Sequence, residues 1–139
     1  MKLMRSTLWL RVSSIISFLF AAGHTMGGRV DWSPIGDTDV LRAMRAYHFE
    51  VQGVTRSYMD FYRGFGWGGT VSLVLQGVLL WQLSRLAKDH PQAVRPLVVT
   101  FAVASAAFTV VTWAYIFPVP TAFSAVLTVC LVMAAAGRD

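Results

Sequence analysis

The chain alternates between long apolar runs and shorter connections that carry most of its charge. The apolar runs cover about residues 8–28, 64–86, 97–116 and 119–136. A helix needs roughly 20 apolar residues to cross the approximately 30 Å of hydrocarbon in a bilayer. The first run also resembles a signal peptide in its charged start, but we interpret it as a membrane helix. The pattern predicts an all-α integral membrane four-helix bundle, with residues 1–139 forming a single transmembrane domain.

The connection between the first two runs is longer than a simple turn requires. Asp37 to Asp39 offers the side chains that begin a helix. After them, apolar residues recur at spacings of three and four, and basic or polar residues occupy another face. This spacing predicts an amphipathic interfacial helix over about residues 38–56. Its apolar face would contain Val40, Met44, Tyr47, Val51 and Val54.

Composition supports a membrane location and weighs against nucleic-acid binding. The chain is 55% hydrophobic and 14% charged, with a net charge of +5, whereas soluble domains are about 25% charged. The basic residues lie at the ends of apolar runs rather than in one patch, as expected for topology signals and headgroup contacts. Cys130 is the single cysteine, so an internal disulfide is excluded and no zinc signature appears. We therefore expect the lipid bilayer, and not nucleic acid, to be a partner.

The distribution of lysine and arginine gives a modest preference for orientation. With both termini in the cytoplasm, seven basic residues lie inside and five lie outside, as the positive-inside rule favours. The inside set is Lys2, Arg5, Arg11, Arg85, Lys88, Arg95 and Arg138, and the outside set is Arg29, Arg42, Arg45, Arg56 and Arg63.

Small residues four apart predict where the helices pack. Gly23 and Gly27 form one such pair in the first span, and Gly64 and Gly68 form another at the start of the second. Helices in lipid associate through close backbone contact, which small residues allow. We expect these four glycines to bring the outer ends of the first two spans together.

Polar residues near these glycines form the candidate site. Ionisable groups within spans are costly and suggest function. His24 lies about one turn from the outer end of the first span, and Arg56 and Asp60 are spaced to pair if the second helix begins early. His24 could also pair with Asp60. The alternative for His24 is a structural histidine satisfied by one interhelical hydrogen bond, and the alternative for the residues around Asp60 is an interfacial anchor without a ligand. The candidate ligand-binding residues are His24, Arg56, Tyr58, Asp60 and Tyr62.

No cofactor is expected from the sequence. Haem b would need axial ligands on facing elements, and His24 and His48 could provide them only if the interfacial helix folded over the first span. We therefore do not assign haem to this pair.

Two motifs carry a resemblance to a known group of proteins. They are GHTxG, at Gly23 to Gly27, and RSYxDFYxGFG, at Arg56 to Gly66. Together they resemble a family of small four-span bacterial membrane proteins without an assigned activity, and the layout is broadly similar to DoxX-like proteins. The similarity covers roughly the first 85 residues. It implies a bacterial inner membrane and a single site containing His24, Arg56, Tyr58 and Asp60, but it implies no reaction.

Three functions remain open from the sequence. The first is a binding or accessory protein that holds a lipid-soluble or amphipathic ligand, such as a quinone or lipid, at an outer-leaflet site. The second is an intramembrane isomerase or cyclase in which Asp60 and His24 serve as acid and base. The third is a structural subunit of a larger membrane complex or a homo-oligomer. No sequence feature separates the first hypothesis from the third.

Overall fold

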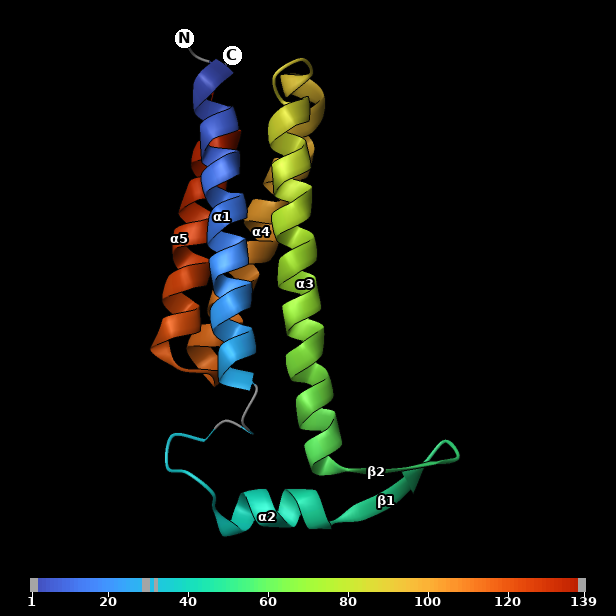
Figure 1. Ribbon diagram of the computed structural model, residues 1–139. Helices are drawn as coiled ribbons and strands as arrows, with labels where there is room; N and C mark the ends of the chain where they lie inside the picture. The colour runs from blue at the N-terminus through green and yellow to red at the C-terminus, as the bar shows by residue number, and fades with distance from the viewer. Residues whose placement is uncertain (1–2, 29–30, 32, 138–139) are drawn as a thin grey trace. The chain divides into compact units, whose positions relative to one another are not determined.

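The computed structural model describes residues 3–28, 31 and 33–137, which form mainly helices and one β-hairpin (Figure 1). Lys2, Arg29 and Arg138, which enter the predictions above, lie outside the described residues. In chain order the elements are α1 (Leu3–Gly28), α2 (Asp39–Ala46), β1 (His48–Val51), β2 (Val54–Ser57), α3 (Tyr58–Leu86), α4 (Pro91–Tyr115) and α5 (Pro118–Ala136).

Four of these helices are long and apolar enough to cross a membrane. The apolar segments are Ser6–Gly27, Tyr58–Leu86, Pro91–Tyr115 and Pro118–Ala136, and their mean hydropathy is between 1.2 and 2.0. This confirms the prediction of a helical chain with the spans of a multi-pass membrane protein. Prolines at the first positions of α4 and α5 suit helix starts, because the first-turn amides have no helical partner.

The chain forms two compact units. The first unit comprises the chain up to Phe20 and from Leu73 onward, and the second unit is Ala21–Ser72. The first unit therefore contains most of α1, the second half of α3, and both α4 and α5. The second unit contains the end of α1, all of α2, the hairpin and the start of α3.

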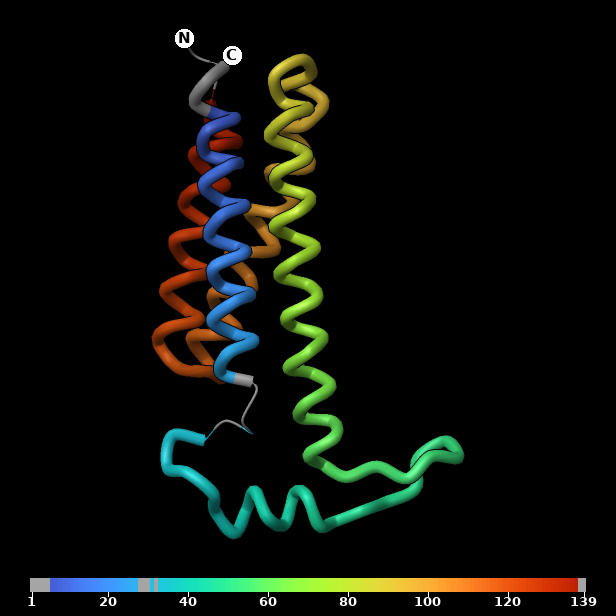
Figure 2. Tube along the Cα trace, viewed as in Figure 1, coloured from blue at the N-terminus to red at the C-terminus, as the bar shows by residue number. Residues whose placement is uncertain are grey.

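The first unit is held by a core to which each of its helices contributes. Leu10, Leu80, Val98 and Leu131 come from different helices and are at most 1% exposed. The chain turns back between α4 and α5 (Figure 2), and Ile116 and Phe117 lie between the two helices. The resulting helix pair buries Val98 and Leu131 within the core.

Hydroxyl and amide groups link helices within the first unit. Ser14 donates to the Gly77 carbonyl at 2.7 Å, and the Gln76 amide donates to Ser17 Oγ at 3.1 Å, which joins α1 to α3. Between α4 and α5, Thr128 donates to Ser105 Oγ at 3.0 Å. Such bonds specify helix contacts in lipid, where apolar side chains gain little by meeting one another.

The glycines that allow close helix contact are not the four predicted from the sequence. A Cβ on Gly77 would lie 3.0 Å from the Phe18 ring, and a Cβ on Gly69 would lie 3.0 Å from His24 Nε2. At the predicted packing positions, a Cβ would meet no heavy atom of the described residues within 4 Å; these positions are Gly23, Gly27, Gly64 and Gly68. The prediction was wrong because spacing alone does not identify the side of a helix that faces its neighbour.

The helix predicted over residues 38–56 forms only in its first part, and the prediction was wrong for the residues after Ala46. Thr38 caps a helix that ends at Ala46, and residues 48–57 form an antiparallel hairpin. Gln52 and Gly53, with φ values of 50° and 80°, supply the two left-handed residues of a tight two-residue turn. Glycine in the second position allows this geometry, and the chain reverses there instead of continuing as a helix.

The side of α2 that is buried differs from the predicted apolar face. Leu41 is 9% exposed, whereas Val40 is 68% exposed. Arg42 and Arg45 of α2 form ion pairs with Asp37 and Asp31 of the preceding segment.

Candidate functional site

Asp60 belongs to the hydrogen-bonded cap that begins α3. Its Oδ2 accepts from the Ser57 amide at 2.8 Å and from Ser57 Oγ at 2.9 Å, and the Asp60 amide donates back to Ser57 Oγ at 3.2 Å. This reciprocal pattern is a capping box, which satisfies amides that the first helical turn leaves without partners. The Asp60 carboxylate therefore stabilises the start of α3.

His24 joins α1 to α3 within the second unit. Its Nε2 lies 2.9 Å from the Gly66 carbonyl oxygen. A carbonyl can only accept, so Nε2 carries the proton and donates in this bond. The neighbouring Thr25 hydroxyl lies 3.2 Å from the Thr70 hydroxyl, and the absence of a side chain on Gly69 makes room for the imidazole. The GHTxG and RSYxDFYxGFG motifs thus meet at His24 and Gly66.

The predicted pairs between Asp60 and its basic neighbours do not form. Asp60 bonds to Ser57 and His24 bonds to Gly66, so the proposed His24–Asp60 pair was wrong. Arg56 lies in β2 rather than one helical turn before Asp60, and its Nη1 donates to the Thr55 carbonyl at 2.8 Å. The cause is the start of α3 at Tyr58, which leaves Arg56 outside the helix.

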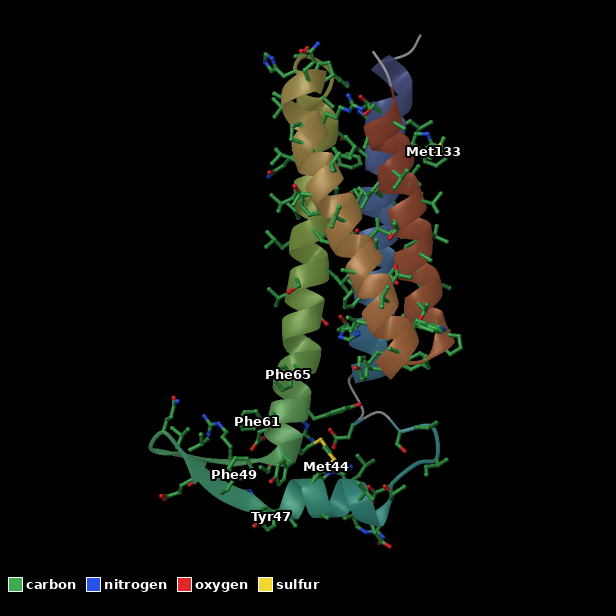
Figure 3. All side chains as sticks on the ribbon, turned by 180° about the vertical axis from the view of Figure 1, so that it is seen from behind. Met44, Tyr47, Phe49, Phe61, Phe65 and Met133 are labelled. Atoms are coloured by element: carbon green, nitrogen blue, oxygen red, sulfur yellow. The ribbon has the colours of Figure 1, made fainter. Side chains whose placement is uncertain are left out.

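Four aromatic rings form a continuous group, here called the aromatic stack, from Tyr47, Phe49, Tyr58 and Phe61. Neighbouring ring centroids are 5.8 Å apart for Tyr47 and Tyr58, 5.0 Å for Phe49 and Tyr58, and 5.9 Å for Phe49 and Phe61. The hairpin creates the stack, because its pairing of His48 with Ser57 places the flanking residues 47 and 58 next to each other. Figure 3 shows Phe49 and Phe61 near the junction of the hairpin with α3, and Phe65 farther along the helix.

Much of the aromatic stack is exposed. Tyr47 is 63% exposed, Tyr58 is 54% exposed and Phe61 is 43% exposed. Arg56 is also exposed and forms no ion pair within the described part of the chain. Arg56 is the cross-strand partner of Phe49, which places this basic residue beside the exposed aromatic rings. Tyr62 is exposed on the same turn of α3 as Phe61.

A network of ion pairs in the second unit was not foreseen from the sequence. Both oxygens of Asp31 accept from Arg63, at 2.8 Å each, and Oδ2 also accepts from Arg45 Nε at 2.9 Å. Arg45 Nη1 continues the network to Asp37 at 2.8 Å. The Arg63 hydrogen bonds are the main reason that the pKa of Asp31 is lowered, and the bond from Arg45 does the same for the pKa of Asp37. Asp31 and Arg63 are far apart in sequence, and no spacing rule connects them.

The described residues were searched for side chains that could hold a metal ion. No group of three or more histidine, cysteine, aspartate or glutamate side chains that could hold a metal occurs in residues 3–28, 31 and 33–137. His48 lies in β1, with Nδ1 2.8 Å from the Ala46 carbonyl oxygen, and His24 is bonded to Gly66. Both imidazoles thus have one ring nitrogen committed to a backbone carbonyl.

Comparisons with known proteins give no match: no family model, curated protein or solved structure corresponds to this chain. The resemblance carried by the two motifs stays a prediction. The meeting of His24 and Gly66 is a property of the structure itself and does not depend on that resemblance.

Proposed function

We propose that this chain is an accessory membrane protein that binds a lipid-soluble, amphipathic molecule, a quinone or a lipid, on the aromatic stack. The observation that carries the proposal is the exposure of three of the four stacked rings beside Arg56. Aromatic faces bind flat rings by offset stacking. A guanidinium donates hydrogen bonds to carbonyl or phosphate oxygens. A quinone head presents both a flat ring and carbonyl oxygens.

The bonds of Asp60 and His24 favour binding over acid–base catalysis. A general base must reach the proton that it removes, but the Asp60 carboxylate accepts two hydrogen bonds from Ser57 at the start of α3. His24 uses Nε2 to hold Gly66. Both groups thus have structural roles that explain their presence without a reaction.

The proposed site lies at the outer leaflet of a bacterial inner membrane. The aromatic stack is next to the first turn of α3, which starts an apolar segment of 29 residues. Tyrosine and tryptophan are enriched where such segments meet the headgroups. Both termini are proposed to be cytoplasmic from the seven-to-five distribution of basic residues, and the long helices are proposed to form a four-helix bundle.

The test is to identify what the protein retains and whether retention depends on the stack. The full chain is extracted gently from its own membrane, and the molecules that remain bound are identified by native mass spectrometry and by organic extraction. The Tyr58→Leu variant removes one stacked ring but keeps an apolar side chain. We expect it to lower the occupancy of the retained molecule about three- to tenfold, the usual contribution of one aromatic contact.

Phe65→Leu is the matched control, because Phe65 is also exposed on α3, at 78%, but its ring does not contact the rings of the aromatic stack. It should leave retention unchanged. Equal loss in both variants, or an extract with the same lipid ratios as the bulk membrane, would overturn the proposal. In that case the stack would be an interfacial anchor without a ligand of its own.

A further inference from the structure

The first unit contains two guanidinium groups at a single tryptophan ring. The Arg11 guanidinium lies 5.7 Å from the centre of the Trp81 ring, and that of Arg85 lies 5.9 Å from it. Arg11 is on α1, whereas Trp81 and Arg85 are on α3. An aromatic face attracts each cation. Two positive charges at one ring nevertheless repel each other, and the repulsion needs a counter-charge.

No carboxylate supplies that charge within the described residues. Every ion pair among them belongs to the second unit. The described side chains of the first unit include Arg11, Arg85, Lys88 and Arg95 but only one acidic residue, Asp89. Arg11 Nε is buried and has no hydrogen-bond partner there. A charged group without an ionic partner is costly to bury, so an anion from outside the chain would stabilise the two guanidinium groups.

The depth of Arg11 limits what the anion can be. Arg11 lies within the apolar segment Ser6–Gly27, about 12 Å from the start of α1 at 1.5 Å per residue. Arg85 lies in the last turn of α3. Long basic side chains near the end of a span extend toward the headgroup level. Basic groups between helices at that level bind lipid headgroups.

We infer that Arg11 and Arg85, held at Trp81, form a binding site for the phosphate of an anionic phospholipid. The phosphate oxygens would accept hydrogen bonds from both guanidinium groups, and the acyl chains would lie against the exposed apolar surface of α3. This site is separate from the aromatic stack, since it belongs to the first unit and uses none of the same residues.

The experiment measures lipid preference in the full-length protein. Protein in phosphatidylcholine nanodiscs is titrated with phosphatidylglycerol, and bound lipid is counted by native mass spectrometry after release. Arg85→Gln should weaken phosphatidylglycerol binding about tenfold, since a charge-assisted hydrogen bond is lost. Lys88→Gln is the matched control, because it removes the same charge two residues beyond α3 without a contact to Trp81. It should change binding less than twofold.

A competition with inorganic phosphate and a Trp81 variant complete the test. Inorganic phosphate added at millimolar concentration should not displace the lipid; displacement would overturn the proposal in favour of a free-anion site. Trp81→Leu keeps both charges and should weaken binding if the ring positions them. Equal effects of Arg85→Gln and Lys88→Gln would mean general surface charge and would also overturn the site. Arg85→Gln should leave the molecule retained by the aromatic stack unchanged, so the two proposals fail separately.

Discussion

Asp31 is the centre of the ion-pair network of the second unit, and its replacement gives the sharpest test of that network. The Asp31→Asn variant keeps the size of the side chain and one acceptor oxygen but removes the negative charge. In the native chain, Asp31 connects the segment before α2 to Arg45 of α2 and to Arg63 of α3. We expect the variant to loosen α2 while leaving α4 and α5 as they are.

The magnitude follows from the contacts. Asp31 accepts three hydrogen bonds of 2.8–2.9 Å, and its side chain is 14% exposed. A hydrogen bond to a charged group contributes about 1.5–3 kcal/mol, but exposed ion pairs contribute only about 0.2–1 kcal/mol. The side chains of Arg45 and Arg63 are 38% and 49% exposed, so the lower range applies to much of the network. We expect a total loss of about 1–2 kcal/mol in local stability, a factor of about 5–30 in the opening equilibrium.

Hydrogen exchange of the backbone amides measures this opening directly. The amides of α2, from Asp39 to Ala46, should exchange about 5–30 times faster in the variant. Raising the salt concentration to about 1 M, where the screening length is about 3 Å, should move the native protein part of the way toward the variant.

Asp39→Asn is the matched control, because Asp39 pairs with Arg42 but its side chain is 95% exposed. It should change exchange by less than twofold. The reasoning would be refuted if both variants had the same effect, or if Asp31→Asn left α2 protected. Either result would mean that the burial of Leu41, and not the ion pairs, holds α2.

Two further predictions concern acid and helix contact. The pKa values of Asp31 and Asp37 are lowered in the folded protein, so their carboxylates stabilise the fold above the ordinary aspartate pKa of about 3.9. This stabilisation is lost as the pH falls through the lowered folded-state pKa values. Amide exchange in α2 should therefore rise below about pH 4, and it should rise less in the Asp31→Asn variant. Gly77→Val should lower the thermal unfolding temperature of the detergent-solubilised protein, because even a Cβ at this position would lie 3.0 Å from the Phe18 ring. Gly68→Val should have a much smaller effect, since a Cβ there meets no heavy atom of the described residues within 4 Å. Equal shifts in the two variants would contradict the contact between Gly77 and Phe18.

Part of the candidate site followed from the sequence, and part did not. His24 was expected to make one interhelical hydrogen bond as an alternative to a functional role, and it bonds to Gly66 on α3. The role of Asp60 could have been found, because serine three residues before an acidic residue at the start of an apolar run is a capping pattern. The turn at Gln52 and Gly53 could also have been found, since two short runs of strand-forming residues flank a pair ending in glycine.

The sequence by itself determined the number of long apolar helices and their approximate limits. Runs of about 20 apolar residues have few alternatives to a membrane helix, because a lipid environment requires every backbone polar group to bond internally. That constraint is local, and it can be seen in composition alone.

Only the tertiary structure decided which residues meet. Gly69 and Gly77 face neighbouring side chains while the glycines of the GxxxG motifs do not, and this depends on the rotation of each helix about its own axis. Asp31 pairs with Arg63 of α3 although 31 residues separate them in the sequence. The aromatic stack exists because the chain turns at Gly53. Contacts between residues distant in sequence depend on the folded path of the chain, which no local pattern of polar and apolar residues contains.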